Sequence, residues 1–202
     1  MSNDLVVTGV GGQGALLAAN AVGEAGTAAG METRVGEIHG MSQRGGSVIA
    51  HVRVGEDVHG PMVPTGRGDA MIALEPMEAL RYAEYLGPDA VVLVNETTEM
   101  PLPVQQGAAE YPDGDAIMDE LHSLGEVVPV DAEGIAREAG DKIAANAVLL
   151  GAFSARVAFP LSAEQLLGGV ETMVPDDAVE VNRRAFEAGR EVIDRERPVS
   201  IP

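Results

Sequence analysis

The sequence contains no cysteine and no tryptophan, and lysine occurs once, at position 142. The absence of cysteine excludes disulfide bonds, catalysis by a thiolate, and any iron–sulfur cluster held by cysteines of this chain. No apolar run approaches the roughly 18 to 20 residues that span a bilayer. The first residues, MSNDLVV, lack the basic segment that opens a secretory signal. We therefore expect a soluble, cytoplasmic protein.

Positive charge is scarce, because 13 basic residues stand against 32 acidic residues and the formal net charge is −19. Such a surface repels the phosphates of nucleic acids and of acidic membranes, so we expect neither as a partner. An acidic composition can simply aid solubility. With a single lysine in the chain, it favours adaptation to high salt, where carboxylates hold water and self-repulsion is screened.

Strand and helix patterns alternate along the chain, which predicts an α/β fold of three layers, α/β/α. The region 33–54 holds two strand patterns with no helix between them, so we expect a mostly parallel but mixed sheet. Apolar residues make up 46% of the chain, enough for a packed core. The expected strands are 5–9, 33–38, 47–54, 69–74, 90–95 and 126–130, and the expected helices are 13–29, 76–86, 115–124, 131–140, 142–158, 163–169 and 176–195.

The stretch LVVTGVGGQG, residues 5–14, places a glycine cluster between a predicted strand and a predicted helix. Gly9, Gly11 and Gly14 satisfy the spacing G-x-G-x-x-G of Rossmann-like dinucleotide-binding turns. Glycines let backbone N–H groups approach an anion, and a helix N-terminus adds partial positive charge. Glu37 lies about where such folds place an acidic ribose ligand. Three interpretations remain open: a dinucleotide site, a site for another phosphate or pyrophosphate, and a purely structural turn.

A second glycine-rich stretch, GEIHGMSQRGGS, covers residues 36–47. Arg44 offers a planar fork for a carboxylate or phosphate, and the glycines after it permit close backbone approach. Alternatively, Arg44 pairs with one of the many surface acids. If the sheet brings this loop beside the glycine turn, both line one crevice at the strand ends. The candidate residues of the loop are His39, Ser42, Gln43, Arg44, Gly45 and Gly46.

Three stretches carry a resemblance to a known family: GVGGQG, EIHGMSQRGGSVIAHVR and ALEPMEALRY. They resemble the gamma module of the 2-oxoacid (pyruvate):ferredoxin oxidoreductases. The longer form HGMSQRGGSV is similar to the small (beta) subunit of the indolepyruvate branch. The resemblance covers residues 5–97 and returns in NAVLLGAFSARVAFPLS, residues 146–162. It implies that residues 1–202 form a single gamma-type domain, with 142–202 as a helical C-terminal part packed on it.

The resemblance implies a subunit of an enzyme that oxidatively decarboxylates a 2-oxo acid to an acyl-CoA and passes electrons to ferredoxin. Indolepyruvate or another aryl pyruvate of amino acid catabolism is the expected substrate. Such enzymes use thiamine diphosphate, Mg and [4Fe-4S] clusters. Thiamine enzymes carry Gly-Asp-Gly and then paired Asn, whereas here Gly114-Asp115-Ala116 is a near miss and Asn146 stands alone. We therefore expect these cofactors in a large partner subunit, and no catalytic or metal-binding residue in this chain.

Under the same resemblance, the glycine turn would hold a phosphate-bearing group, with coenzyme A as the expected ligand. Arg44 would neutralise charge there or contact the partner, while Ser42 and Gln43 would orient the loop. His39 is either a hydrogen-bonding residue at the subunit border or a structural histidine. Two alternatives remain: a stand-alone NAD-dependent oxidoreductase and a purely structural interaction subunit. The residues expected to hold the phosphate-bearing group are Gly11, Gly12, Gln13 and Gly14.

Other polar residues receive no chemical role from the sequence. Glu75 and Glu78 flank the start of a predicted helix, where carboxylates favour the helix dipole. His51, His59 and His122 are expected to be structural or on the surface.

Overall fold

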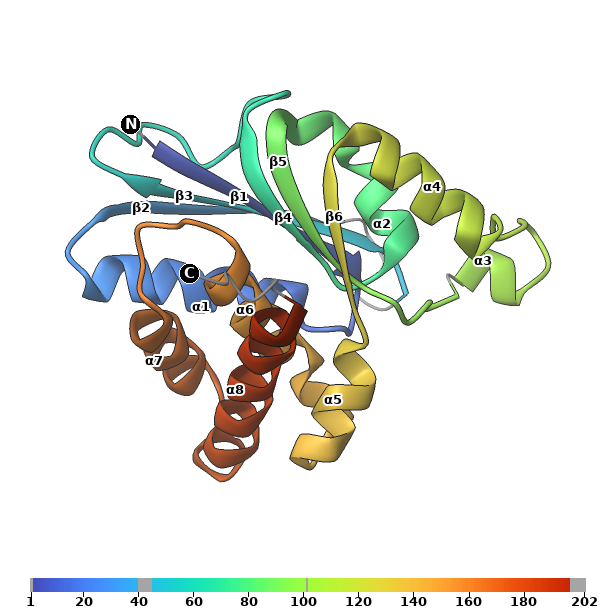
Figure 1. Ribbon diagram of the computed structural model, residues 1–202. Helices are drawn as coiled ribbons and strands as arrows, with labels where there is room; N and C mark the ends of the chain where they lie inside the picture. The colour runs from blue at the N-terminus through green and yellow to red at the C-terminus, as the bar shows by residue number, and fades with distance from the viewer. Residues whose placement is uncertain (1, 40–44, 101, 197–202) are drawn as a thin grey trace, which may run out of the picture.

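The computed structural model describes residues 2–39, 45–100 and 102–196, and its strands form a six-stranded sheet (Figure 1). The order across the sheet is β2-β3-β1-β4-β5-β6. The strands are β1 (Ser2–Val10), β2 (Glu32–His39), β3 (Ser47–Gly55), β4 (Gly68–Ala73), β5 (Leu86–Asn95) and β6 (Glu126–Val130).

Helices cover both faces of the sheet, as Figure 1 shows. One face carries α1 (Ala15–Ala28), α5 (Ala132–Ala139), α6 (Ala145–Arg156), α7 (Ala163–Met173) and α8 (Val179–Glu196). The other face carries α2 (Pro76–Arg81) and α4 (Gly114–Leu124), with the short α3 (Leu102–Gln105) beside them. Each face has its own cluster of buried apolar side chains. The predicted three-layer α/β/α fold is confirmed.

The sheet is mixed because one strand, β3, runs antiparallel to both of its neighbours, β1 and β2. The pairs β1–β4, β4–β5 and β5–β6 are parallel. Two successive strands without an intervening helix can pair as an antiparallel hairpin, whereas a parallel connection needs a crossover. The mixed sheet was therefore readable from the sequence, although its strand order was not.

The observed bounds of several helices differ from the predicted ones. The helix expected over 76–86 ends at Arg81, and the chain passes through a 3₁₀ turn at Ala83–Tyr85 into β5. Leu86 pairs with Gly68 of β4, so strand pairing overrides the apolar spacing that favoured helix. The helix expected over 142–158 begins with a 3₁₀ turn, Lys142–Ala144, and α6 proper starts at Ala145.

The C-terminal helices belong to the larger buried cluster. Every residue from Ala145 to Phe153 of α6 is buried. A Cβ atom added to Gly151 would lie 1.9 Å from the carbonyl oxygen of Phe186, so the backbones of α6 and α8 touch there. Within the described residues, no helix is long and apolar enough to cross a membrane.

Candidate ligand-binding site

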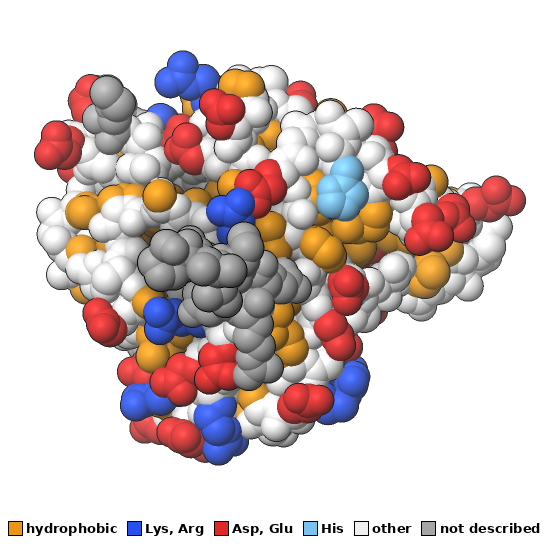
Figure 2. Space-filling view, in the orientation of Figure 1, with side chains coloured by type: hydrophobic (Ala, Val, Ile, Leu, Met, Phe, Trp, Pro, Cys, Tyr) orange, Lys and Arg blue, Asp and Glu red, His pale blue; other side chains and the backbone are white. Residues whose placement is uncertain are grey.

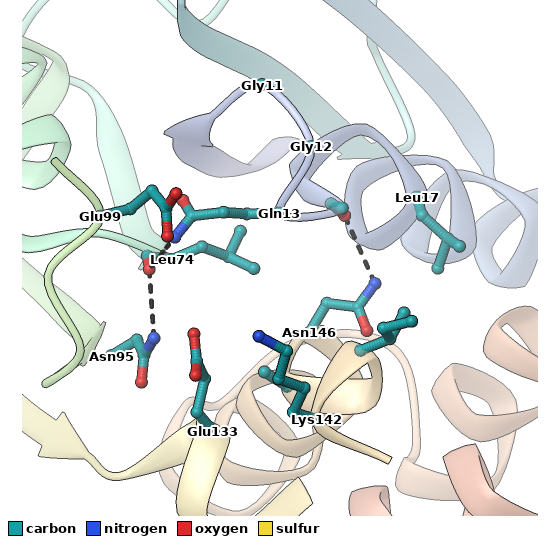
Figure 3. A pocket seen from close by; sticks show the side chains of 13 residues that line it. Gly11, Gly12, Gln13, Leu17, Leu74, Asn95, Glu99, Glu133, Lys142 and Asn146 are labelled. Carbon is teal, nitrogen blue, oxygen red and sulfur yellow. Dashed lines mark hydrogen bonds between the residues drawn. The ribbon is translucent and has the colours of Figure 1, made fainter. Parts of the chain in front are cut away.

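A cavity of about 320 Å³ opens at the carboxyl ends of the parallel strands (Figure 3). It lies where β1 turns into α1, where β4 and β5 end, and where α6 begins. Its lining combines backbone, amide, carboxylate and apolar groups, with a single ammonium group. The lining residues are Gly11, Gly12, Gln13, Gly14, Leu17, Leu74, Asn95, Glu99, Glu133, Lys142, Ile143, Ala145 and Asn146.

The cavity coincides with a change in the direction of the chain connections. After β1 the chain enters α1 on one face of the sheet, and after β4 it enters α2 on the opposite face. Neighbouring parallel strands whose connections leave on opposite faces open a crevice at their carboxyl ends. Open α/β sheets bind ligands in such crevices, so the topology alone marks this position.

The glycine turn reaches the cavity with its backbone in conformations that favour glycine. Gly12 has φ +113° and Gly14 has φ +86°, and a side chain at either position would strain the backbone. Gly14 is also the residue that precedes α1, and no side chain caps that helix. The first N–H groups of an α-helix have no partner within the helix. An anion in the cavity could therefore accept hydrogen bonds from this end of α1.

Gln13 ties the turn to the sheet. Its Oε1 accepts a hydrogen bond from the backbone N–H of Val10 at 2.8 Å, and its Nε2 donates to the carbonyl of Leu74 at 3.2 Å. The side chain thus links the ends of β1 and β4. Gly9, although part of the motif, is buried in β1, where an added Cβ would lie 3.0 Å from Gln13 Oε1. Gly9 therefore serves packing and does not line the cavity.

Two asparagines that the sequence did not mark as site residues complete the walls. Asn95 Nδ2 donates to the carbonyl of Leu74 at 3.2 Å, and its Oδ1 accepts from the N–H of Ala132 at 3.1 Å. Asn146 Nδ2 donates to the carbonyl of Gly14 at 3.4 Å. Both side chains are buried, so these bonds fix the positions of the strand ends and of the turn.

The second glycine-rich stretch lies directly beside the glycine turn. The N–H of Gly11 donates to the carbonyl of Gly46 at 2.7 Å, and the N–H of Gly45 donates to the carbonyl of Gly11 at 3.1 Å. His39 is the last residue of β2, and its backbone pairs with Val48. Ser42, Gln43 and Arg44 lie outside the described residues.

The structure corrects the expectation for Glu37. In the Rossmann arrangement the acidic ribose ligand follows a strand adjacent to β1. Here β3 lies between β1 and β2, and Glu37 pairs with Ala50 on an exposed outer strand. Glu37 does not line the cavity. The acids that do line it are Glu99 and Glu133, which the sequence analysis did not select.

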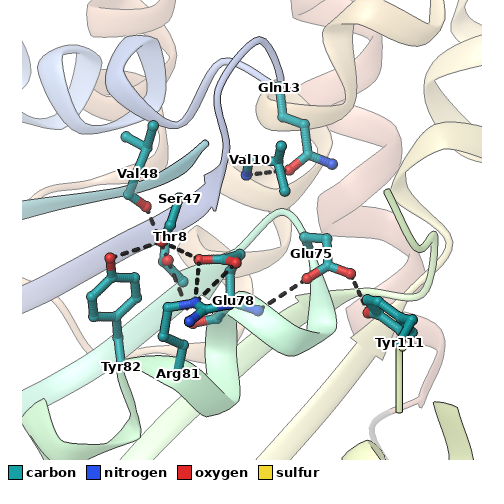
Figure 4. Close-up of polar contacts among 10 residues, drawn as sticks. All are labelled: Thr8, Val10, Gln13, Ser47, Val48, Glu75, Glu78, Arg81, Tyr82 and Tyr111. Atoms are coloured by element: carbon teal, nitrogen blue, oxygen red, sulfur yellow. Dashed lines mark hydrogen bonds and ion pairs between the residues drawn. The ribbon is translucent and has the colours of Figure 1, made fainter. Parts of the chain in front are cut away.

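A buried polar cluster lies where the second glycine-rich stretch re-enters the sheet (Figure 4). Glu78 of α2 is 2% exposed and accepts a hydrogen bond from Ser47 Oγ, at the start of β3. Ser47 Oγ also lies 2.8 Å from the hydroxyl of Tyr82, and Arg81 Nε donates to Glu78 Oε1 at 3.1 Å. Since Ser47 follows Gly46, this cluster anchors the strand end that holds Gly11.

Glu75, the residue before α2, is fully buried beside that cluster. Burial raises the pKa of its carboxyl group, while hydrogen bonds from Tyr111 and from the N–H of Glu78 oppose the rise. The same burial and the bond to Glu75 raise the pKa of the Tyr111 hydroxyl. Both side chains therefore favour their neutral forms more than exposed groups would.

The site has no arrangement for metal chemistry in the part of the chain that the structure describes. No three His, Cys, Asp or Glu side chains gather closely enough there to hold an ion.

His51 is fully buried in β3, edge-on to Tyr85 with ring centroids 4.8 Å apart, and burial lowers its pKa. His59 is exposed beside Asp57. These two histidines take the structural and surface places expected for them.

Sequence comparison decides the family. Residues 4–192 match the family model described as pyruvate ferredoxin/flavodoxin oxidoreductase. The chain belongs to this family. The match includes the glycine turn, the second glycine-rich stretch and α6, so the parts that form the cavity all lie inside the family domain.

Similarity to known proteins covers nearly the whole length of this family member. It is 47% identical over 192 residues to the indolepyruvate oxidoreductase subunit IorB of Thermococcus kodakarensis, covering 92% of this chain and 93% of the relative. The IorB subunit of Pyrococcus horikoshii is 48% identical over 188 residues, with the same two coverages. The gamma subunit of keto/oxoacid ferredoxin oxidoreductase from Geobacter sulfurreducens is similar in structure, with TM-score 0.70, 25% identity, and 96% and 99% of the two chains covered.

Proposed function

We propose that this member of the family is the small subunit of an indolepyruvate oxidoreductase. The observation that carries the proposal is its similarity to IorB subunits along more than nine-tenths of both chains. The complete enzyme would oxidatively decarboxylate indolepyruvate, or another aryl pyruvate from amino acid breakdown, to an acyl-CoA. Its electrons would pass to ferredoxin. Residues 1–202 would act in it as a single gamma-type domain.

The sequence of this chain indicates which subunit would bind the cofactors. The complete enzyme would need thiamine diphosphate with Mg for decarboxylation and [4Fe-4S] clusters for electron transfer. A chain without cysteine cannot ligate such clusters by thiolates. Its Gly114-Asp115-Ala116 sequence also departs from the Gly-Asp-Gly of thiamine sites. We therefore assign both cofactors to a large partner subunit and make this chain a heteromer subunit without them.

The role of this chain would be to bind a phosphate-bearing group, part of coenzyme A, at the glycine turn. Two features fit that group: the positive φ angles of Gly12 and Gly14, and the uncapped N-terminus of α1. A cavity of about 320 Å³ lies at the lower end of ligand sites, which span roughly 300 to 1,000 Å³. It would accept one part of coenzyme A and leave the rest to the partner.

The remaining residues of the second glycine-rich stretch would act around this group. Gly45 and Gly46 hold Gly11 by backbone hydrogen bonds, so their part is to fix the turn. Arg44 would neutralise ligand charge or contact the partner, and Ser42 and Gln43 would orient the loop. His39 would sit at the subunit border.

The surface supports the further proposal of a high-salt setting. Acidic side chains are spread over the face shown in Figure 2 rather than gathered in one patch. A dispersed acidic surface is not a docking patch for one basic partner, whereas it suits a protein whose self-repulsion is screened by concentrated salt.

The test is co-purification of this chain from its own cells at high salt. A cysteine-rich, brown partner should accompany it, and the eluate should reduce a viologen dye when indolepyruvate and coenzyme A are both present. A colourless chain that purifies alone and binds NAD(H) would refute the proposal and favour a stand-alone NAD-dependent oxidoreductase.

A pair of glycine variants separates a ligand-binding turn from a structural one. Neither Gly12 (φ +113°) nor Gly30 (φ +74°) has any atom within 4 Å of an added Cβ, and Gly30 lies at the far end of α1. Gly12→Ala should reduce activity while the complex still assembles, and Gly30→Ala should leave activity unchanged. Equal effects of both variants on assembly alone would favour the purely structural subunit.

A further inference from the structure

Among the described residues that line the cavity, acidic side chains outnumber basic ones. Glu99 and Glu133 line it, and Lys142 is the basic residue among its lining residues. Among the described lining residues, one positive and two negative groups sum to a formal charge of −1. A wall of that charge does not attract anions in general, so any anion must be held by directed contacts.

Lys142 is unusual in this chain for both its identity and its position. It is the single lysine of 202 residues, and every other basic position is arginine. It opens the 3₁₀ turn before α6, where Asp141 Oδ1 accepts from the N–H of Ile143 at 3.0 Å and fixes the local backbone. Figure 3 shows its ammonium group directed into the cavity, between Glu133 and Asn146.

The ammonium group of Lys142 makes no hydrogen bond or ion pair with any residue that the structure describes. Glu133, which also lines the cavity, pairs with Arg137 at 3.7 Å. Arg81, Arg156 and Arg183 are likewise paired with glutamates. Lys142 is thus exposed at the edge of the cavity and has no partner among the described residues, whereas Glu133 has one.

We propose that Lys142 is an anion-binding residue of this site and contacts a phosphate of a nucleotide-like ligand. The proposal deepens the function given above, because it assumes that the glycine turn holds a phosphate-bearing group. A phosphate between the turn and Lys142 would receive backbone N–H groups from one side and an ammonium group from the other.

The two carboxylates define the rest of the ligand. Glu99 and Glu133 accept hydrogen bonds from hydroxyl or amino groups, so we expect such groups of the ligand beside them. Ile143, 77% exposed on the cavity edge, offers an apolar contact for a ring. Phosphate, hydroxyl groups and a ring together describe a nucleotide, the class that includes the ADP part of coenzyme A.

The experiment measures binding of coenzyme A, dephospho-coenzyme A, ADP and inorganic phosphate by equilibrium dialysis at one fixed salt concentration. It uses the full chain and, separately, the co-purified complex. Lys142→Gln should weaken coenzyme A binding about ten- to hundred-fold, the loss expected for one charge-assisted hydrogen bond. Lys142→Arg should restore most of it. Glu133→Gln should leave affinity unchanged or increase it, because a repulsive charge is removed.

The matched control is Arg156→Gln, which removes a positive charge paired with Glu126 away from the cavity. If Arg156→Gln weakens binding as much as Lys142→Gln, the effect is net charge and the proposal fails. It also fails if neither the chain nor the complex binds any of the four probes. If Lys142→Gln weakens binding of coenzyme A but not of dephospho-coenzyme A or ADP, Lys142 meets the 3′-phosphate; if it weakens binding of all three, Lys142 meets the diphosphate.

These outcomes are separable from those of the proposed function. An active complex whose coenzyme A affinity ignores Lys142 would refute this inference and keep the function. A lone chain that binds ADP through Lys142, with no oxidoreductase partner, would keep the inference and refute the function.

Discussion

Replacing Gly14 by alanine tests whether the glycine turn and α6 form one unit. Gly14 has φ +86°, and an added Cβ would lie 2.7 Å from Asn146 Nδ2. That amide now donates to the carbonyl of Gly14 at 3.4 Å. Gly14→Ala therefore imposes backbone strain and also displaces the buried side chain that supports the turn.

The two costs can be added from their separate sources. A residue other than glycine in the left-handed region costs about 1 to 2 kcal/mol. Loss of the Asn146 hydrogen bond costs about 0.5 to 1.5 kcal/mol, so the total is about 1.5 to 3.5 kcal/mol. For a chain of this size, each kcal/mol lowers the melting temperature by about 2 to 4 °C. The expected decrease is about 3 to 14 °C.

The assay is thermal unfolding followed by circular dichroism at high salt, since the chain has no tryptophan to report by fluorescence. Gly30→Ala supplies the control for strain, because Gly30 has φ +74° and no atom within 4 Å of an added Cβ. Asn146→Ala alone loses the same bond to Gly14. The double variant should therefore be less destabilised than the sum of the single variants, by about 0.5 to 1.5 kcal/mol. Strict additivity, or equal effects of Gly14→Ala and Gly30→Ala, would refute the coupling.

Three further expectations concern the polar cluster and the surface. Ser47→Ala should lower stability by about 1 to 3 kcal/mol, because Glu78 stays buried without its hydroxyl donor, and Ser47→Thr should recover part of the loss in the same melts. Since burial raises the pKa of Glu75, its ionisation opposes folding, and stability should fall as pH rises above the ordinary carboxyl range near about 4.3. Glu75→Gln should flatten that decline, and an unchanged pH profile would contradict it. Dilution of salt from about 1 M to 0.1 M lengthens the screening distance from about 3 to 10 Å, so repulsion between acidic side chains should lower the melting temperature. The same dilution of sucrose, which carries no charge, should not produce this decrease.

The local features of the fold were readable because each depends on nearby residues. Buried strands such as LVVTG at 5–9 and AVVLVN at 90–95 are short apolar runs between turn signals, and the structure places them in β1 and β5. The two strand patterns at 33–54, with no helix between them, predicted a mixed sheet, and β3 is its antiparallel strand. The glycine turn was placed between strand and helix for the same reason.

The features that the sequence did not provide all depend on long-range pairing. Asn146 reaches Gly14 across 132 positions, and no local pattern encodes that contact. Glu78 was assigned to the helix dipole because acids at helix starts are common, and its burial follows from Ser47 lying opposite it. Glu37 was misplaced because a dinucleotide fingerprint assumes that β2 adjoins β1.

Insertion of β3 between β1 and β2 changes which residues surround the glycine turn. It moves the acid after the second strand to the sheet's outer edge, so the ribose contact of a dinucleotide fold is lost on that side. The crevice instead opens toward β4, where α5 and the start of α6 contribute Glu133, Lys142 and Asn146. A turn that resembles a dinucleotide fingerprint is therefore completed by residues more than a hundred positions away. The lining of this cavity thus depends on the later part of the chain as much as on the glycines.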